Sequence, residues 1–262
     1  MSFLLFIPIA LLGWLCGALV NYLTDALPWR RRLTAPFCQK CESAIPFWNY
    51  FIWPRRCDSC SWRRSRRTWI VELIFVLIAI GLWALPVGKL GFWGGLFLLT
   101  YFGVVVLIDL EFRLILHPVS LFGALAGLGL GIYLHGATLD GVKVTLLGGI
   151  AGFGIMWLVY MLGELLLRLI ARLRGDKVDD VAFGFGDVNL SGVLGLILGW
   201  PGISAGLLLA IFLAGAVSLV YLLLMVILRR YRRYAAIPYG PFLVAGAVIL
   251  IFFPANLQQL FK

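Results

Sequence analysis

The sequence is short of charge, and of acidic residues above all. Asp and Glu contribute 12 of its 262 residues against 22 Lys and Arg, and charged residues make up 13% of the total. Hydrophobic residues reach 62%, whereas soluble domains are about half apolar. The apolar residues form long runs and lack the polar–apolar alternation of barrel strands. This pattern excludes an ordinary soluble domain and a membrane β-barrel.

Histidines and cofactor loops are also scarce. His117 and His135 are the only histidines, and they lie at opposite ends of one apolar run, so we expect no metal site that they share. Within residues 28–67, the region large enough for an extramembrane module, no glycine-rich loop opens a helix in the way that phosphate or dinucleotide cofactors require. The net charge of +10 comes from basic residues in short loops between apolar runs. The positive-inside rule explains that placement, and we expect no nucleic acid partner.

Eight apolar segments each approach the roughly 20 residues that a helix needs to cross a bilayer. They are residues 3–23, 69–87, 90–108, 115–134, 143–166, 187–200, 203–228 and 237–254. Met1 and Ser2 provide no basic region before the first segment, so we expect a retained helix rather than a cleaved signal peptide. The expected fold is an all-α membrane protein with eight transmembrane helices.

Lys and Arg are distributed unevenly among the predicted loops. The loops after the first, third, fifth and seventh spans share one side and carry 19 of the 22 Lys and Arg residues. Basic loops stay in the cytoplasm, so both termini are expected outside. We expect a first transmembrane helix at 1–27, a small cytoplasmic module at 28–67 and a seven-helix core at 68–262.

The cytoplasmic module contains two CxxC motifs. Cys38 and Cys41 form the first, and Cys57 and Cys60 form the second, with 15 residues between the motifs. Zinc takes four thiolates in a tetrahedron, and two such turns can hold one ion. Disulfides or a redox pair are the alternatives, but the predicted cytoplasmic side is reducing. We therefore predict a structural zinc ion in a zinc-ribbon-like insertion.

Two aspartates lie at the ends of predicted spans. Asp109 ends the third span, and Asp187 begins the sixth, after Gly184 and Gly186. The alternation of spans puts both at the cytoplasmic interface, where ionisable groups are functional candidates. Two carboxylates at one depth can share a proton and activate water, and the glycines would let a peptide backbone approach. Alternatively, each aspartate is an interfacial or helix-capping residue.

Taken in order, these motifs resemble those of the prepilin leader peptidases, the GxGD-type membrane aspartic peptidases of bacteria. The resemblance extends over nearly the whole chain. Besides the four cysteines, the matching residues are 17–21, 27–28, 45–46, 49, 71–73, 108–110, 118, 184–187 and 237–242.

The resemblance implies a protease of the bacterial inner membrane that cuts type IV prepilins or pseudopilins at the cytoplasmic face. The cut follows a glycine that ends a short basic leader. Asp109 and Asp187 would be the catalytic pair, and Pro238 and Gly240 would join the two glycines of the second motif in contacting substrate. Many members then methylate the new N-terminus with S-adenosylmethionine.

Three positions depart from the family pattern. Asn189 replaces a usual Lys, Ala26 replaces an Arg, and Arg55 replaces a Gly in a stretch that the family links to methylation. Methyl transfer is therefore predicted to be the weaker or absent activity, although Glu42 or Glu72 could face the cationic sulfonium of the cofactor. The rival hypothesis is a scaffold or transporter without enzymatic activity, although a transporter would carry ionisable groups near mid-membrane.

Overall fold

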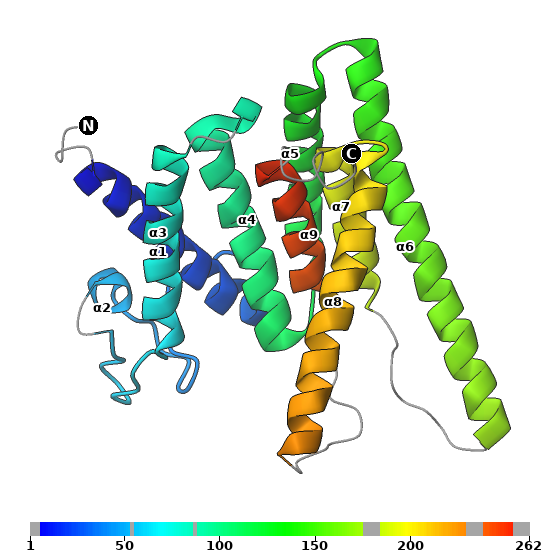
Figure 1. Cartoon of the computed structure of the whole chain (residues 1–262). Coiled ribbons are helices and arrows are strands. Elements are labelled where there is room, and N and C mark those ends of the chain that lie inside the picture. The colour runs from blue at the N-terminus through cyan, green and yellow to red at the C-terminus, as the bar shows by residue number, and fades with distance from the viewer. Residues whose placement is uncertain (1–5, 53–54, 86–87, 175–183, 229–237, 254–262) are drawn as a thin grey trace. The chain divides into compact units, whose positions relative to one another are not determined.

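The computed structural model describes residues 6–52, 55–85, 88–174, 184–228 and 238–253. Within these ranges the regular structure is helical, and the only strand-like pairing is two isolated bridges, Phe37 with Ala44 and Arg56 with Arg63. The chain divides into two compact units, residues 1–108 and 109–262, whose helices are drawn in Figure 1.

The first unit is built on a close helix pair. Its elements are α1 (Phe6–Arg30), α2 (Phe47–Phe51), α3 (Arg67–Ala84), the short 3-10 helix η2 (Gly88–Leu90) and most of α4 (Gly91–Phe112). α1 packs along α3 so tightly that a Cβ on Gly17 would lie 2.7 Å from Glu72 Cα. Small residues allow membrane helices to approach in this way. The segment between α1 and α3 carries α2 and the cysteine motifs.

The second unit is arranged around α7. It begins at Asp109 in the last turn of α4 and contains α5 (His117–His135), α6 (Leu139–Arg174), α7 (Phe185–Leu198), α8 (Gly202–Ile227) and α9 (Gly240–Phe252). α7 packs against each of the other four helices, and Gly195 on α7 meets Gly148 on α6 backbone to backbone. Most of α7 is consequently buried, so a polar residue on it lies in the interior of the unit.

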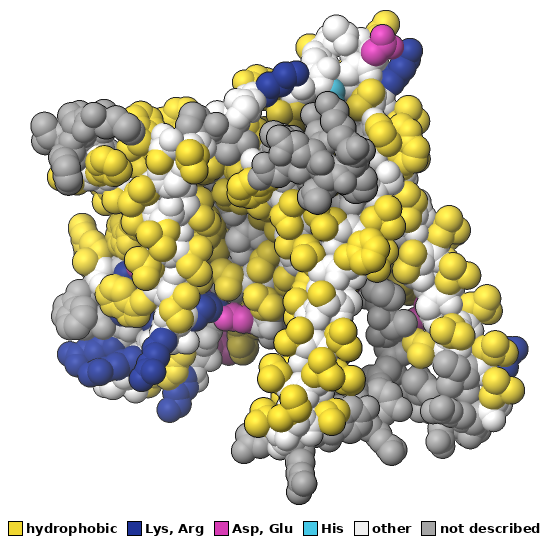
Figure 2. Space-filling view, in the orientation of Figure 1, with side chains coloured by type: hydrophobic (Ala, Val, Ile, Leu, Met, Phe, Trp, Pro, Cys, Tyr) yellow, Lys and Arg dark blue, Asp and Glu magenta, His cyan; other side chains and the backbone are white. Residues whose placement is uncertain are grey.

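The helices have the lengths and surfaces of membrane helices. Six helical segments among the described residues are long and apolar enough to cross a bilayer. α7 and α9 are apolar but have 14 and 13 residues, fewer than the roughly 20 of a full span. Figure 2 shows hydrophobic side chains along α8, where Phe212 and Ile227 are exposed. The chain is a multi-pass membrane protein, and crossing by all eight predicted spans stays a prediction.

Candidate functional site

Asp109 is held by a residue that lies 131 positions later in the chain. The backbone N–H of Gly240, the first residue of α9, donates a 3.1 Å hydrogen bond to Asp109 Oδ2. A Cβ on Gly240 would lie 2.6 Å from the same oxygen, so a larger residue would displace the carboxylate. Asp109 is only 5% exposed. The start of α9 thus positions a buried carboxylate at the end of α4.

Asp187 lies in the first turn of α7. Gly184 is the N-cap of this helix, and its carbonyl accepts the Asp187 N–H at 3.0 Å. The Asp187 side chain is buried, and its carboxylate lies within hydrogen-bonding reach of the Gly184 backbone. A Cβ on Gly186 would lie 2.7 Å from the Cβ of Ile115. α7 therefore begins against the segment that follows α4, and this contact brings Asp187 toward Asp109.

The carboxyl groups of Asp109 and Asp187 are close enough to interact electrostatically. Tyr239, which precedes Gly240, also lies within electrostatic reach of Asp187. The negative charge of one carboxylate disfavours ionisation of the other, so such a pair favours one charged and one protonated member. A charged carboxylate can take a proton from water, while a protonated one can polarise a carbonyl group.

The residues predicted to contact substrate surround this pair in different ways. Gly240 touches the first carboxylate, and a Cβ on Gly184 would lie 3.8 Å from Oδ2 of the second. Gly186 packs against the segment after α4, so its missing side chain serves helix packing. Pro238 is half-buried and precedes α9. Tyr239 was not among the predicted residues, although its place between Pro238 and Gly240 in a matched motif was a signal for it.

The four cysteines of the first unit converge. Their Sγ atoms all lie within 4.8 Å of one another, with Cys38 to Cys60 at 3.6 Å and Cys41 to Cys57 at 3.5 Å. Bonds of about 2.3 Å to one tetrahedral zinc ion would separate the sulfurs by about 3.8 Å. None of the four is in a disulfide. The cluster therefore fits a single metal ion.

Two matching turns present these sulfurs. In the first, the N–H of Glu42 bonds to the carbonyl of Cys38, and in the second the N–H of Ser61 bonds to that of Cys57, both at 2.9 Å. Glu42 and Ser61 have positive φ values of 57° and 54°. The Ser43 hydroxyl contacts Cys57 Sγ at 3.3 Å and helps to lower the pKa of this thiol to about 6. Zinc binds the thiolate form, which this contact favours.

Asp25 joins the cysteine module to α1. Its carboxylate accepts hydrogen bonds from the Tyr50 hydroxyl and from Arg64 Nη2, both at 2.6 Å, and from Arg67 Nη2 at 2.5 Å. Burial and the charge of Asp25 raise the pKa of Tyr50 well above its usual value, so this hydroxyl remains a donor. Asp25 was not among the predicted residues, although an acidic residue inside an apolar run was a signal for it.

Glu72, the acid that could have faced a cationic cofactor, already has two partners. Its Oε2 accepts hydrogen bonds from Trp14 Nε1 at 2.9 Å and from Arg55 Nη2 at 2.8 Å. The Arg55–Glu72 pair is buried, with side chains 6% and 5% exposed. Glu42 is exposed and pairs with Arg30. The Glu72 carboxylate is therefore already satisfied and does not fit the sulfonium of S-adenosylmethionine, whereas Glu42 is 72% exposed and its pair with Arg30, at 3.4 Å, is a weak surface contact.

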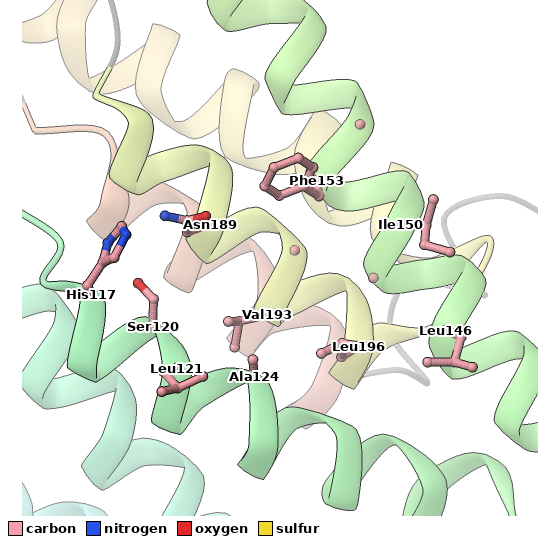
Figure 3. A pocket seen from close by; sticks show the side chains of 13 residues that line it. His117, Ser120, Leu121, Ala124, Leu146, Ile150, Phe153, Asn189, Val193 and Leu196 are labelled. Atoms are coloured by element: carbon pink, nitrogen blue, oxygen red, sulfur yellow. The ribbon is translucent and has the colours of Figure 1, made fainter.

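A separate cavity of about 580 Å³ lies between α5, α6 and α7 (Figure 3). His117, Ser120 and Asn189 line one end, and apolar side chains such as Phe153 and Leu196 line the rest. Neither Asp109 nor Asp187 belongs to the lining. Asn189 follows Asp187 by two positions, which places the two side chains about 200° apart around the helix. The cavity therefore lies on another face of α7 from the aspartates.

Known proteins similar to this chain share one description. A profile of the type IV leader peptidase family matches residues 96–223. The "Prepilin leader peptidase/N-methyltransferase" of Burkholderia pseudomallei (strain 1026b) is 30% identical over 243 residues, which cover 87% of this chain and 71% of that protein. The protein of the same name from Pectobacterium carotovorum is 30% identical over 226 residues, covering 84% and 74%. The one from Pseudomonas aeruginosa is 29% identical over 223 residues, covering 82% and 70%. No solved structure matches.

Proposed function

This chain belongs to the type IV leader peptidase family, and we propose that it is a membrane aspartic endopeptidase that removes the leader from type IV prepilins or pseudopilins. The observation that carries the proposal is the buried pair formed by Asp109 and Asp187, whose carboxyl groups interact electrostatically. The backbone N–H of Gly240 orients the first carboxylate. Buried acidic pairs at helix ends are costly in a membrane protein, and peptide hydrolysis is a chemistry that uses such a pair.

The proposed reaction needs only these two groups and water. The ionised carboxylate takes a proton from a water molecule, whose oxygen forms a bond to the carbon of the scissile carbonyl. The protonated carboxyl group gives its proton to the carbonyl oxygen. When the C–N bond breaks, the carboxyl group that took the water proton gives it to the leaving amine, and the other carboxylate regains a proton from a hydroxyl of the tetrahedral intermediate, so that the leader ends in a carboxyl group and both aspartates return to their starting states. A scaffold or transporter without this chemistry would not need both acids.

The distribution of charge supports a cytoplasmic location for the site. Under the positive-inside rule, the basic loops favour a position of the cysteine module and both aspartates at the cytoplasmic face of the bacterial inner membrane. The region at 28–67 would hold one structural zinc ion through Cys38, Cys41, Cys57 and Cys60. A basic leader peptide would reach the aspartates from this side.

We propose that methyl transfer is the weaker or absent activity of this chain. Arg55 adopts a φ of 56°, in the region that favours glycine. Its guanidinium donates a hydrogen bond to the carboxylate of Glu72. The mass of the new pilin N-terminus, measured with S-adenosylmethionine supplied, is expected to show cleavage without a quantitative gain of one methyl group. Full methylation would contradict this part of the proposal.

The peptidase is tested by reconstituting the purified chain in liposomes with a prepilin and following the leader by mass spectrometry. Asp109→Asn and Asp187→Asn are each expected to reduce cleavage by at least about 100-fold, the usual contribution of a general acid or base. Asp140→Asn is the matched control, since the Asp140 side chain is 91% exposed. Cleavage by either active-site variant at the wild-type rate would refute the proposal.

A further inference from the structure

The short helix α2 in the cysteine module exposes large apolar side chains. Phe47 and Trp48 are 63% and 68% exposed, and Ile52, which follows the helix, is 44% exposed. These residues are neighbours in the chain, and the rings of Phe47 and Phe51 contact each other with centroids 4.5 Å apart and planes tilted by 42°. Clustered aromatic residues of this size are unusual on a module that faces water and mark an interaction surface.

Hydrogen bonds fix the depth of this surface relative to α1 and α3. Arg55 Nη2 donates to the carbonyl of Phe51, the last residue of α2, at 2.7 Å and to Glu72 Oε2 at 2.8 Å. Glu72 is the sixth residue of α3, roughly 7–8 Å along the helix from Arg67. It also touches Gly17, near the middle of α1. The end of α2 is therefore level with the interior of two membrane helices and does not lie beyond their ends.

The surrounding side chains are those of a membrane interface. Trp69 and Ile70, in the first turn of α3, are 54% and 57% exposed, and the Arg55 guanidinium lies 3.9 Å from the centre of the Trp69 ring. Tryptophans gather where the hydrocarbon meets the headgroups. Because Arg55 contacts both the carbonyl of Phe51 and the ring of Trp69, the end of α2 lies beside a tryptophan of this kind.

The charge of the module complements an anionic surface. Among its described residues the exposed Lys and Arg are Arg30, Arg31, Arg32, Lys40, Arg56, Arg63 and Arg66. Figure 2 shows Lys and Arg side chains gathered over the segment that joins α1 to α3. The exposed acids of this segment already have partners, since Glu42 pairs with Arg30 and Asp58 accepts from Asn49. The exposed surface of this segment therefore carries a net positive charge, and both ends of the segment are joined to membrane helices.

We propose that Phe47, Trp48 and Ile52 insert into the bilayer interface and that the exposed arginines of the module bind the headgroups of anionic phospholipids. The zinc cluster then lies over a lipid surface, clamped by its two helices and by α2. Lipid is the occupant because the surface lies at membrane depth, beside side chains that face the bilayer. This inference does not depend on the peptidase activity.

The test places a photoreactive residue on the surface in the full chain. Trp48→p-benzoylphenylalanine is compared with Ser59→p-benzoylphenylalanine, since Ser59 is also exposed in the module but lies in the second CxxC turn. Both proteins are put into nanodiscs of phosphatidylcholine and phosphatidylglycerol in equal amounts, irradiated and analysed by mass spectrometry. Adducts with lipid are expected from position 48 and not from position 59. Phosphatidylglycerol adducts should exceed phosphatidylcholine adducts at least about fivefold, the effect of about one basic residue near the surface.

Three outcomes would overturn the proposal. Equal lipid adducts from the two positions would show that α2 has no preferred place at the interface. Equal yields of adducts with the two lipids would show that the arginines do not select anionic headgroups. Adducts from position 48 with an added prepilin or a second copy of the chain, in place of lipid, would identify the surface as a protein-docking site.

Discussion

At the scale of single residues, the site depends on a backbone amide that reaches a carboxylate from a distant helix. The Gly240 N–H bonds to Asp109 Oδ2 at 3.1 Å, and the glycine leaves no room for a side chain beside that oxygen. The hydrogen bond and the close approach both fix the direction of the carboxyl group. Small displacements of a catalytic group carry large kinetic costs.

Gly240→Ala is therefore expected to slow prepilin cleavage by about 10- to 100-fold, because the added methyl group would push the Asp109 carboxylate out of position. Initial rates in liposomes measure the effect. Gly129→Ala is the matched control, since Gly129 lies within α5 and a Cβ there meets nothing within 4 Å. An unchanged rate for Gly240→Ala beside a normal control would show that this contact does not position the carboxylate.

The sequence could indicate the two candidate acids of the site but not all of the residues that contact them. Asp109 and Asp187 were identified because span alternation puts them at one depth. The contact of Gly240 with Asp109 links residues 131 positions apart, and no local pattern encodes such a distance. Asp25 was not predicted because the sequence around an acid in a long apolar run does not indicate which distant arginines will pair with it. Its partners Arg64 and Arg67 lie about 40 residues later.

At the scale of elements, the cysteine module is built from one turn used twice. Each CxxC turn closes through a hydrogen bond to its first cysteine and is flanked by one isolated bridge. The spacing of the cysteines was enough to predict the convergence of four sulfurs. It could not predict that α2 would be bound to the interior part of α3, because that depends on the buried Arg55–Glu72 pair.

The purified chain is expected to contain about one zinc ion, because four thiolates close a single tetrahedral site. Elemental analysis should show that Cys38→Ser with Cys41→Ser releases the metal, and proteolysis should then cut within residues 36–62. Cys16→Ser is the control, since Cys16 lies on α1 outside the cluster. Full zinc content in the double variant would exclude this ligand set.

At the scale of the whole molecule, the described residues contain a helix within each of the eight predicted spans, but α7 and α9 have 14 and 13 residues, and six helical segments are long enough to cross a bilayer. Helix boundaries could be predicted only to within several residues, because helices and apolar runs do not end together: α6 continues to Arg174, beyond the predicted end at 166, whereas a turn ends α7 before the apolar run does. Gly199, for example, ends α7 with a φ of 68°. The prediction that all eight cross the membrane rests on the distribution of Lys and Arg.

This topology predicts opposite exposure for two alanines. In a Cys16→Ser background, Ala137→Cys, between α5 and α6, should react with an impermeant thiol reagent added to spheroplasts. Ala35→Cys, in the cysteine module, should react only after permeabilisation. Both alanines are exposed, so the difference would report the side of the membrane. The reverse pattern would place the basic loops outside and contradict the cytoplasmic site.

The central claim is that Asp109 and Asp187 act as one catalytic unit, and the most direct measurement is the cleavage rate of Asp109→Asn, Asp187→Asn and the double variant under identical conditions. Residues that act as a unit show strongly non-additive losses. Each single variant is expected to lose as much activity as the double variant, with zinc content and membrane insertion unchanged. If the losses of the two single variants multiply in the double variant, or if either single variant keeps most of the wild-type rate, the paired mechanism is wrong.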